Sequence, residues 1–150
     1  MLNPKLSKKA IEDLLDKKFR QAVKAIAGYK CEKCGFNGGD WTGVQVSSVL
    51  EAHHVFSRNN KSTRWDVKNG ICLCKRHHQA AQYSSFNGVE RFSAHGTPAE
   101  FMDWIEEYRG SEWLDKLRIK THTMQKFLKE DYQRVCDELD AIIDQYGKTV

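Results

Sequence analysis

Apolar residues recur at intervals of three and four positions near the start of the chain, at Ile11, Leu14, Leu15, Phe19, Val23 and Ile26. This spacing predicts an amphipathic helix over about residues 8–27, because it places all six side chains on one helical face. Ser7 is the expected N-cap and Gly28 the expected end of the helix. The opposite face is rich in lysine.

The pattern changes after residue 28. Four glycines and two cysteines between residues 29 and 43 predict turns. Apolar and β-branched residues over 46–56 predict a strand, a polar loop follows to about residue 67, and residues 71–73 are short enough to be the hairpin partner. Helix-favouring residues then run from 74 to about 84. The order strand, loop, strand, helix, with helices on both sides, predicts an α+β fold.

Two further helices are predicted in the last third of the chain. Thr97, Pro98 and Glu100 match an N-cap, a first-position proline and a capping-box acid, and Gly110 would end that helix. A last helix is predicted from about His122 to Tyr146. Its apolar positions follow a heptad-like spacing, at Leu128, Tyr132, Val135, Leu139, Ile142 and Tyr146. This seam would either pack on its own domain or form a homodimer.

The length of 150 residues suits one domain with appended helices. We divide it into a basic N-terminal helix at 1–28, a core at 29–90 and a helical extension at 91–150. We find no apolar stretch long enough to cross a membrane and no leader peptide, so a cytoplasmic protein is expected.

The net charge of +4 is unevenly distributed along the chain. Six Lys and Arg face a single acid between residues 55 and 78, whereas twelve acids outnumber seven Lys and Arg between 99 and 146. A polyanion would be drawn to the front half and repelled by the back half. The alternative is that these charged residues only form the solvent-exposed faces of helices and bind no polyanion. That alternative explains the loop at 57–68 less well than it explains the first helix.

Cysteines occur in a metal-binding pattern. The odd count of five cysteines argues against a disulfide framework. In a reducing compartment, paired cysteines more often bind a metal ion than form a disulfide. Cys31 and Cys34 form one C-x-x-C pair, and Cys74 and His77 form a second pair of the same spacing. Four ligands fill the tetrahedral shell of zinc and leave no position for a substrate, so this ion would be structural. Two buried pairs of free cysteines are the alternative.

Histidines and one asparagine flank the predicted hairpin. His53 and His54 end the first strand and Asn69 begins the second. His78 directly follows His77, the last residue of the second metal-binding pair. Adjacent strand residues point to opposite faces, so His53 and His54 would do different jobs. One can bind a metal ion while the other reaches a water. Phosphodiester hydrolysis needs both, because a cation must hold the phosphate oxygens and a base with a pKa near neutral must activate water.

The strings Glu51-Ala-His53-His54, Asn69-Gly-Ile-Cys-Leu-Cys74 and Cys74-Lys-Arg-His77-His78 resemble the HNH endonuclease family in its zinc-containing branch. The resemblance covers residues 31 to about 82. It implies a ββα-metal (His-Me finger) core stapled by zinc. In that core His54 is the general base and His53 and His78 ligate a catalytic divalent ion. Asn69 would position the base by holding the loop between the strands.

The resemblance also narrows the function. It implies a metal-dependent endonuclease that hydrolyses double-stranded or branched DNA, and the loop after residue 57 is similar to proteins of phages and mobile elements. His77 stands where many relatives have cysteine, which zinc accepts. Gln82 stands where some relatives carry a further histidine ligand. Mg²⁺ prefers oxygen ligands, whereas two imidazoles suit manganese, cobalt, nickel or zinc, so the sequence does not fix the catalytic ion. Mg²⁺, Mn²⁺ and Ni²⁺ are the candidates.

Basic residues near the predicted site are candidates for phosphate contacts, namely Arg58, Lys61, Arg64, Lys68, Lys75 and Arg76. Trp65 would either pack in the core or stack on a base. The rival interpretation is a zinc-stapled module that binds DNA or assists recombination without cutting. It accounts for zinc and charge, but it leaves the joint spacing of the histidines and Asn69 without a reason.

Overall fold

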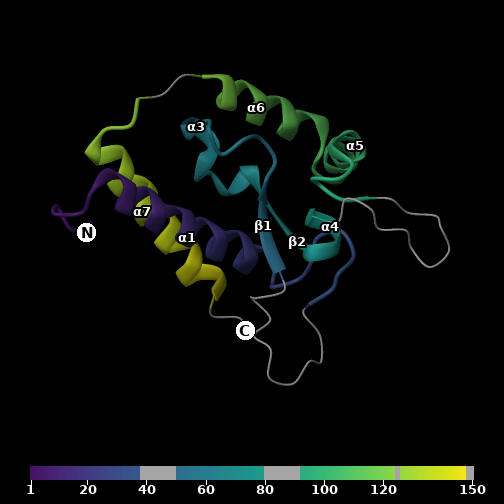
Figure 1. Cartoon of the computed structure of the whole chain (residues 1–150), viewed down its shortest axis with the longest axis horizontal. Coiled ribbons are helices and arrows are strands. Elements are labelled where there is room, and N and C mark those ends of the chain that lie inside the picture. The colour runs from purple at the N-terminus through teal and green to yellow at the C-terminus, as the bar shows by residue number, and fades with distance from the viewer. Residues whose placement is uncertain (38–49, 80–91, 124–125, 148–150) are drawn as a thin grey trace.

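The computed structural model describes residues 1–37, 50–79, 92–123 and 126–147. Its elements run in the order α1 (Lys8–Ile26), β1 (Leu50–His54), α3 (Lys61–Arg64), η1 (Val67–Asn69), β2 (Gly70–Cys74), α4 (Lys75–Gln79), α5 (Pro98–Arg109), α6 (Ser111–His122) and α7 (Lys129–Tyr146). Helices surround one small sheet (Figure 1). This mixture agrees with the predicted α+β class.

The sheet consists of β1 and β2, paired antiparallel. His53 pairs with Ile71, and His54 pairs with Gly70 at the end where the loop begins. The predicted hairpin is therefore present. The residues at 46–49 that we assigned to the first strand and those at 80–84 that we assigned to the helix after β2 lie outside the described residues.

Helix α1 forms where the apolar spacing predicts it. The Ser7 hydroxyl accepts a hydrogen bond from the Ala10 amide at 3.1 Å, which confirms the N-cap. After the helix, Gly28 has a φ of 64°, a conformation that glycine adopts at little cost. The buried face of α1 carries Leu15, Phe19 and Val23, and the helix contacts both strands and α7.

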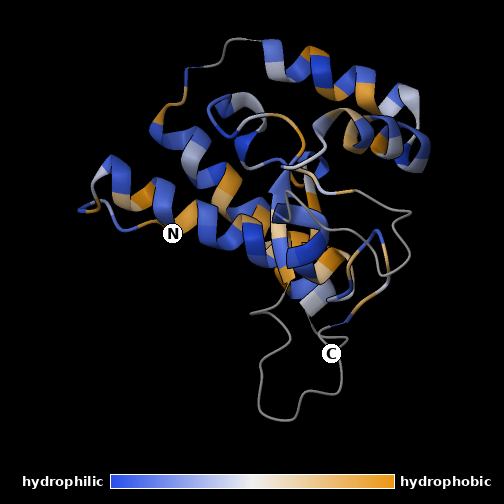
Figure 2. Ribbon diagram, turned by 45° about the vertical axis from the view of Figure 1, so that its right-hand side comes forward, coloured by the Kyte–Doolittle hydropathy of each residue, from blue (hydrophilic) through white to orange (hydrophobic). Residues whose placement is uncertain are grey.

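One hydrophobic core is shared by the sheet and by helices from both ends of the described chain. Fully or almost fully buried members include Leu15 of α1, Leu50 of β1, Leu73 of β2, Ile105 of α5 and Leu139 of α7. Figure 2 shows hydrophobic residues gathered where α1 meets the strands. The predicted divisions 1–28, 29–90 and 91–150 stay predictions, and all three contribute residues to this core.

Helix α5 spans the predicted range, but its first turn differs from the prediction. Gly110 ends it with a φ of 95°. The Thr97 side chain does not cap the helix, because its hydroxyl donates to the Ser93 carbonyl at 3.1 Å and accepts from the Ser93 amide at 2.9 Å. The expected capping box is therefore wrong, and the hydroxyl instead fixes the turn that precedes α5.

The predicted start of the last helix, at about His122, is too early. His122 is the final residue of α6, a helix that the apolar pattern did not reveal, and α7 begins only at Lys129. The seam residues Tyr132, Val135 and Leu139 are buried within the chain, and α7 lies beside α1 (Figure 1). The seam therefore packs on its own domain at these positions, while a homodimer stays a prediction.

Candidate active site and metal centre

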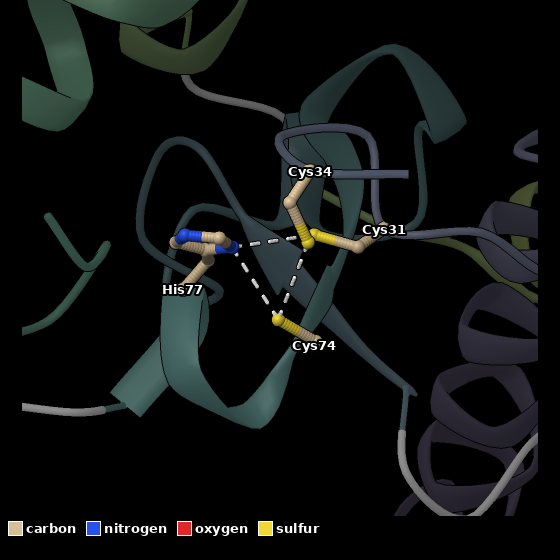
Figure 3. A group of neighbouring side chains, drawn as sticks. All are labelled: Cys31, Cys34, Cys74 and His77. Carbon is tan, nitrogen blue, oxygen red and sulfur yellow. Dashed lines mark hydrogen bonds between the residues drawn. The ribbon is translucent and has the colours of Figure 1, made fainter. Parts of the chain in front are cut away.

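Cys31, Cys34, Cys74 and His77 form a compact cluster (Figure 3). Their ligand atoms all lie within 4.8 Å of one another. Cys74 Sγ is 3.4 Å from His77 Nδ1, and Cys34 Sγ is 3.9 Å from Cys74 Sγ. Tetrahedral zinc with bonds of about 2.0–2.3 Å separates its ligands by roughly 3.5–3.8 Å. The cluster therefore fits a zinc ion.

The turn after α1 presents the first two cysteines. Gly35 donates its amide to the Cys31 carbonyl at 2.7 Å, and the Cys31 amide bonds to the Phe36 carbonyl at 2.7 Å. Gly35 has a φ of 77°, which a side chain would disfavour. Hydrogen bonds with Cys74 and His77 lower the pKa of the Cys31 thiol, against the opposing effect of burial. A deprotonated thiol is the form that binds metal.

A second cluster is formed by His53, His78 and His95, whose ligand atoms also lie within 4.8 Å of one another. They come from β1, from α4 and from the turn before α5. His78 Nε2 and His95 Nε2 are 3.0 Å apart. That separation lies within the roughly 2.8–3.4 Å between two nitrogens bound to one ion at about 2.0–2.1 Å, from octahedral to tetrahedral geometry. Burial, then the neighbouring imidazoles, lower the pKa of His53 to about 3.

His95 is a candidate ligand that sequence reasoning missed. It follows His78 by 17 residues, with no fixed spacing to mark it. The backbone brings it back, because the Ala94 amide bonds to the His77 carbonyl at 2.8 Å and the His95 amide to the His78 carbonyl at 3.0 Å. Gln82, the position where some relatives carry a histidine, lies outside the described residues.

Glu51 holds His78 in place. Residues 51 and 53 are two positions apart on β1, so their side chains lie on the same face of the strand. The Glu51 carboxylate accepts a hydrogen bond from His78 Nδ1 and another from the side-chain nitrogen Nε2 of Gln79 at 2.7 Å. A carboxylate only accepts at neutral pH, so the proton is on Nδ1 of His78. The lone pair of His78 is then on Nε2, which faces His95.

His54 lies apart from this triad. Its ring stacks on Phe19, with centroids 4.5 Å apart and an interplanar angle of 11°. His54 Nε2 is 2.8 Å from the Arg64 carbonyl oxygen, and a carbonyl can only accept, so Nε2 carries the proton. The lone pair of a neutral ring is then on Nδ1. Burial lowers the pKa of His54 below its ordinary value, so the ring is neutral at pH 7.

Asn69 is fully buried and fixes the loop between the strands. Its side-chain oxygen accepts from the Phe56 amide at 2.7 Å, and its nitrogen donates to the carbonyls of Phe56 at 3.0 Å and Thr63 at 3.1 Å. Thr63 precedes Arg64, whose carbonyl bonds to His54. Asn69 thus supports the segment whose Arg64 carbonyl bonds to His54.

The candidate phosphate contacts fall into two groups. Arg64 forms a bidentate ion pair with Asp16 at 3.0 and 2.7 Å, and Lys61 pairs with Glu12 at 2.6 Å. Arg58 also contacts Asp16, at 3.1 Å, with a more exposed side chain. The other group, Lys68, Lys75 and Arg76, lies at exposed positions. The first group is therefore occupied by acids of α1.

Trp65 packs rather than projecting into solvent. It is 4% exposed, and its Nε1 donates to Asp16 at 2.8 Å. Its ring meets Phe127 and Tyr132 edge to face, at 5.5 and 5.8 Å between centroids. Of the two alternatives weighed for this residue, core packing is the one that the structure shows.

The fold and the two clusters define a small α+β protein that could hold two metal ions. Residues 31–82, about a third of the chain, match the family model described as HNH endonuclease, and this segment belongs to that family. Comparisons with curated proteins and with solved structures find no match. Among the described residues, the helices are too short or too polar to cross a membrane.

Proposed function

We propose that this protein is a metal-dependent endonuclease that hydrolyses DNA phosphodiester bonds with His54 as its general base. The observation that carries the proposal is the bond from His54 Nε2 to the Arg64 carbonyl, which leaves the basic lone pair on Nδ1 of a neutral imidazole. A neutral imidazole with a fixed proton can take a proton from water. Asn69 would act as a positioning residue through the loop that it anchors.

The proposed holder of the catalytic ion is the triad of His53, His78 and His95, with Glu51 orienting His78. A divalent ion there would stabilise charge on the phosphate and the leaving oxygen. Three imidazoles favour Mn²⁺ or Ni²⁺ over Mg²⁺. The Cys31, Cys34, Cys74 and His77 cluster would hold structural zinc, since four protein ligands complete its shell.

The strand-strand-helix order of β1, β2 and α4 supports the ββα-metal arrangement as part of this proposal. For DNA contacts we favour Lys68, Lys75 and Arg76, because their positions are exposed. Two narrower predictions rest on sequence resemblance alone: double-stranded or branched DNA as substrate, and a phage or mobile-element origin. A cytoplasmic location stays a prediction from the sequence.

Plasmid nicking by the wild type and by His54→Ala tests the proposal. Each of Mg²⁺, Mn²⁺ and Ni²⁺ is added after loosely bound metal has been removed, and retained zinc is quantified. Loss of the base should lower the cleavage rate by about 10²- to 10⁴-fold with DNA affinity retained. His122→Ala is the matched control, because His122 is an exposed histidine of α6.

His95→Ala tests the third ligand in the same set of proteins. Calorimetric titration of Mn²⁺ or Ni²⁺ should show weaker binding by about tenfold or more, while one zinc per chain is kept. A wild type that binds DNA but cuts nothing with any of the ions, on supercoiled or branched substrate, would favour the accessory DNA-binding module instead. Unchanged ion affinity in His95→Ala would remove His95 from the ligand set.

A further inference from the structure

Helix α1 lies outside the segment that matches the HNH family, yet it makes two of the contacts that define the setting of His54. The first contact is the stack of Phe19 on the imidazole. The two rings are nearly parallel, at 11°, and Phe19 is fully buried. A parallel stack restricts rotation of the imidazole about its χ2 angle, because turning the ring would drive its edge into Phe19.

The second contact runs through the loop. Asp16, one turn before Phe19 on α1, holds the Arg64 guanidinium by two hydrogen bonds and also accepts from Trp65 Nε1. Arg64 and Trp65 are consecutive, so Asp16 holds both sides of the peptide group that joins them. The carbonyl of this peptide group accepts a hydrogen bond from His54 Nε2. One carboxylate on α1 thereby fixes the acceptor that sets the tautomer of the imidazole.

The approach of α1 to the site is close. A Cβ added at Gly70, the β2 partner of His54, would lie 2.3 Å from Val23 Cγ2 and 2.9 Å from Phe19 Cζ. Only the missing side chain of Gly70 lets α1 reach the strand end. The helix is thus seated directly against the residue pair that contains His54.

We propose that Phe19 and Asp16 are positioning residues for His54, so that α1 is part of the active site although it lies outside the family-matched segment. This inference rests on the proposed function for its catalytic meaning. Phe19 fixes the plane of the imidazole from one side, and Asp16 fixes the carbonyl that accepts its Nε2 proton. Both act through His54 and neither touches substrate.

The experiment uses full-length Phe19→Leu and Asp16→Asn. Phe19→Leu keeps apolar volume and removes the flat ring, and Asp16→Asn keeps shape and removes the charge that holds Arg64. Two controls match them. Leu139→Ala weakens the same core from α7, and Asp13→Asn removes an exposed carboxylate of α1 that forms a surface ion pair with Lys9.

At equal folded fraction, both test variants should lose about tenfold or more in kcat, with KM for plasmid DNA within about twofold and zinc content unchanged. Nitrogen NMR of the His54 ring should show the Nε2-protonated tautomer in the wild type. In both variants that signal should become a mixture of tautomers. The controls should keep the wild-type signal and a kcat within about twofold.

Three results overturn the inference. The first is a kcat in Phe19→Leu and Asp16→Asn no lower than in the controls. The second is a wild-type signal with the proton on Nδ1, and the third is an unaltered tautomer in both variants. If the wild type cuts no DNA, the proposed function fails separately, and the NMR signal alone then decides whether α1 positions the ring.

Discussion

Asp16 shows how much one buried charge can organise. It is 7% exposed and accepts hydrogen bonds from Arg64, Trp65 and Arg58, which lie more than 40 positions further along the chain. Burial alone would raise its pKa, but the bonds from Arg64 and Trp65 and the two guanidinium charges outweigh burial and lower it. This acid of a lysine-rich helix is therefore a structural anchor.

We expect Asp16→Asn to lower the free energy of unfolding by about 3 kcal/mol at pH 7, because the substitution leaves the Arg64 charge poorly paired. The pKa of Asp16 is lower in the folded than in the unfolded chain, so its contribution is complete above the unfolded value. That contribution disappears as pH falls through the folded value. The difference between wild type and variant should therefore be constant from pH 7 to about pH 5 and shrink below about pH 4.

Urea unfolding across this range measures the difference, and Asp13→Asn is the control. Zinc is quantified at each pH, and the variants are compared only where each keeps one zinc per chain, because loss of zinc would itself unfold the protein. A difference between wild type and variant that does not shrink with falling pH over these points would show that the charge of Asp16 is not what stabilises the fold.

The sequence could name His53, His54, Asn69 and His78 because their spacing is short and tied to a hairpin and its following helix. Their roles stay predictions; the structure brings His53 and His78 together with His95, while His54 lies apart from that triad. His95 could not be named, since a long segment of no fixed pattern separates it from His78. Arg64 illustrates the opposite case. Its charge indicated a phosphate contact, whereas only tertiary structure reveals the acid that it meets on α1.

At the scale of elements, the contact between α1 and β2 is the tightest constraint described. It depends on Gly70, whose φ of −108° is open to any residue, so the need for glycine comes from the neighbouring helix. Periodicity predicted α1 well because its buried stripe is regular. It did not predict α6, in which only Leu114, Leu117 and Thr121 are buried along 12 residues.

Gly70→Ala should destabilise the protein by about 1–3 kcal/mol, because its methyl group would overlap Val23 and Phe19, which are buried and have little room to move. Thermal and urea unfolding at pH 7 measure this loss. Gly147→Ala is the matched control, since a Cβ there would lie 3.9 Å from Ile143, an ordinary contact. Equal stability of the two variants would show that α1 is free to shift.

At the scale of the whole molecule, the cysteine cluster joins segments that are distant in sequence. It links the turn after α1 to the end of β2 and the start of α4, where one core is shared by helices from both ends of the chain. The sequence anticipated this tie from two short cysteine and histidine pairs. It could not anticipate that the C-terminal helices close over the same core, because helix packing leaves no local motif.

Zinc removal should therefore unfold the whole protein and not only a loop. Cys34→Ser, or wild type treated with a strong chelator, should lose the single cooperative thermal transition seen by circular dichroism, with zinc falling from one per chain toward none. Cys136→Ser is the control, because Cys136 lies on α7 outside the cluster. Retention of zinc and an unchanged melting temperature in Cys34→Ser would contradict the structural role of the cluster.

His77 and His78 are neighbours in α4, yet one faces the cysteines and the other faces His53 and His95. On the proposed function, two adjacent residues therefore bind the two ions: His77 binds the structural zinc and His78 binds the catalytic ion. A cell short of zinc would then hold inert chains however much manganese or nickel it contained. Zinc supply during synthesis, rather than the cutting ion, would set how many molecules can ever become active.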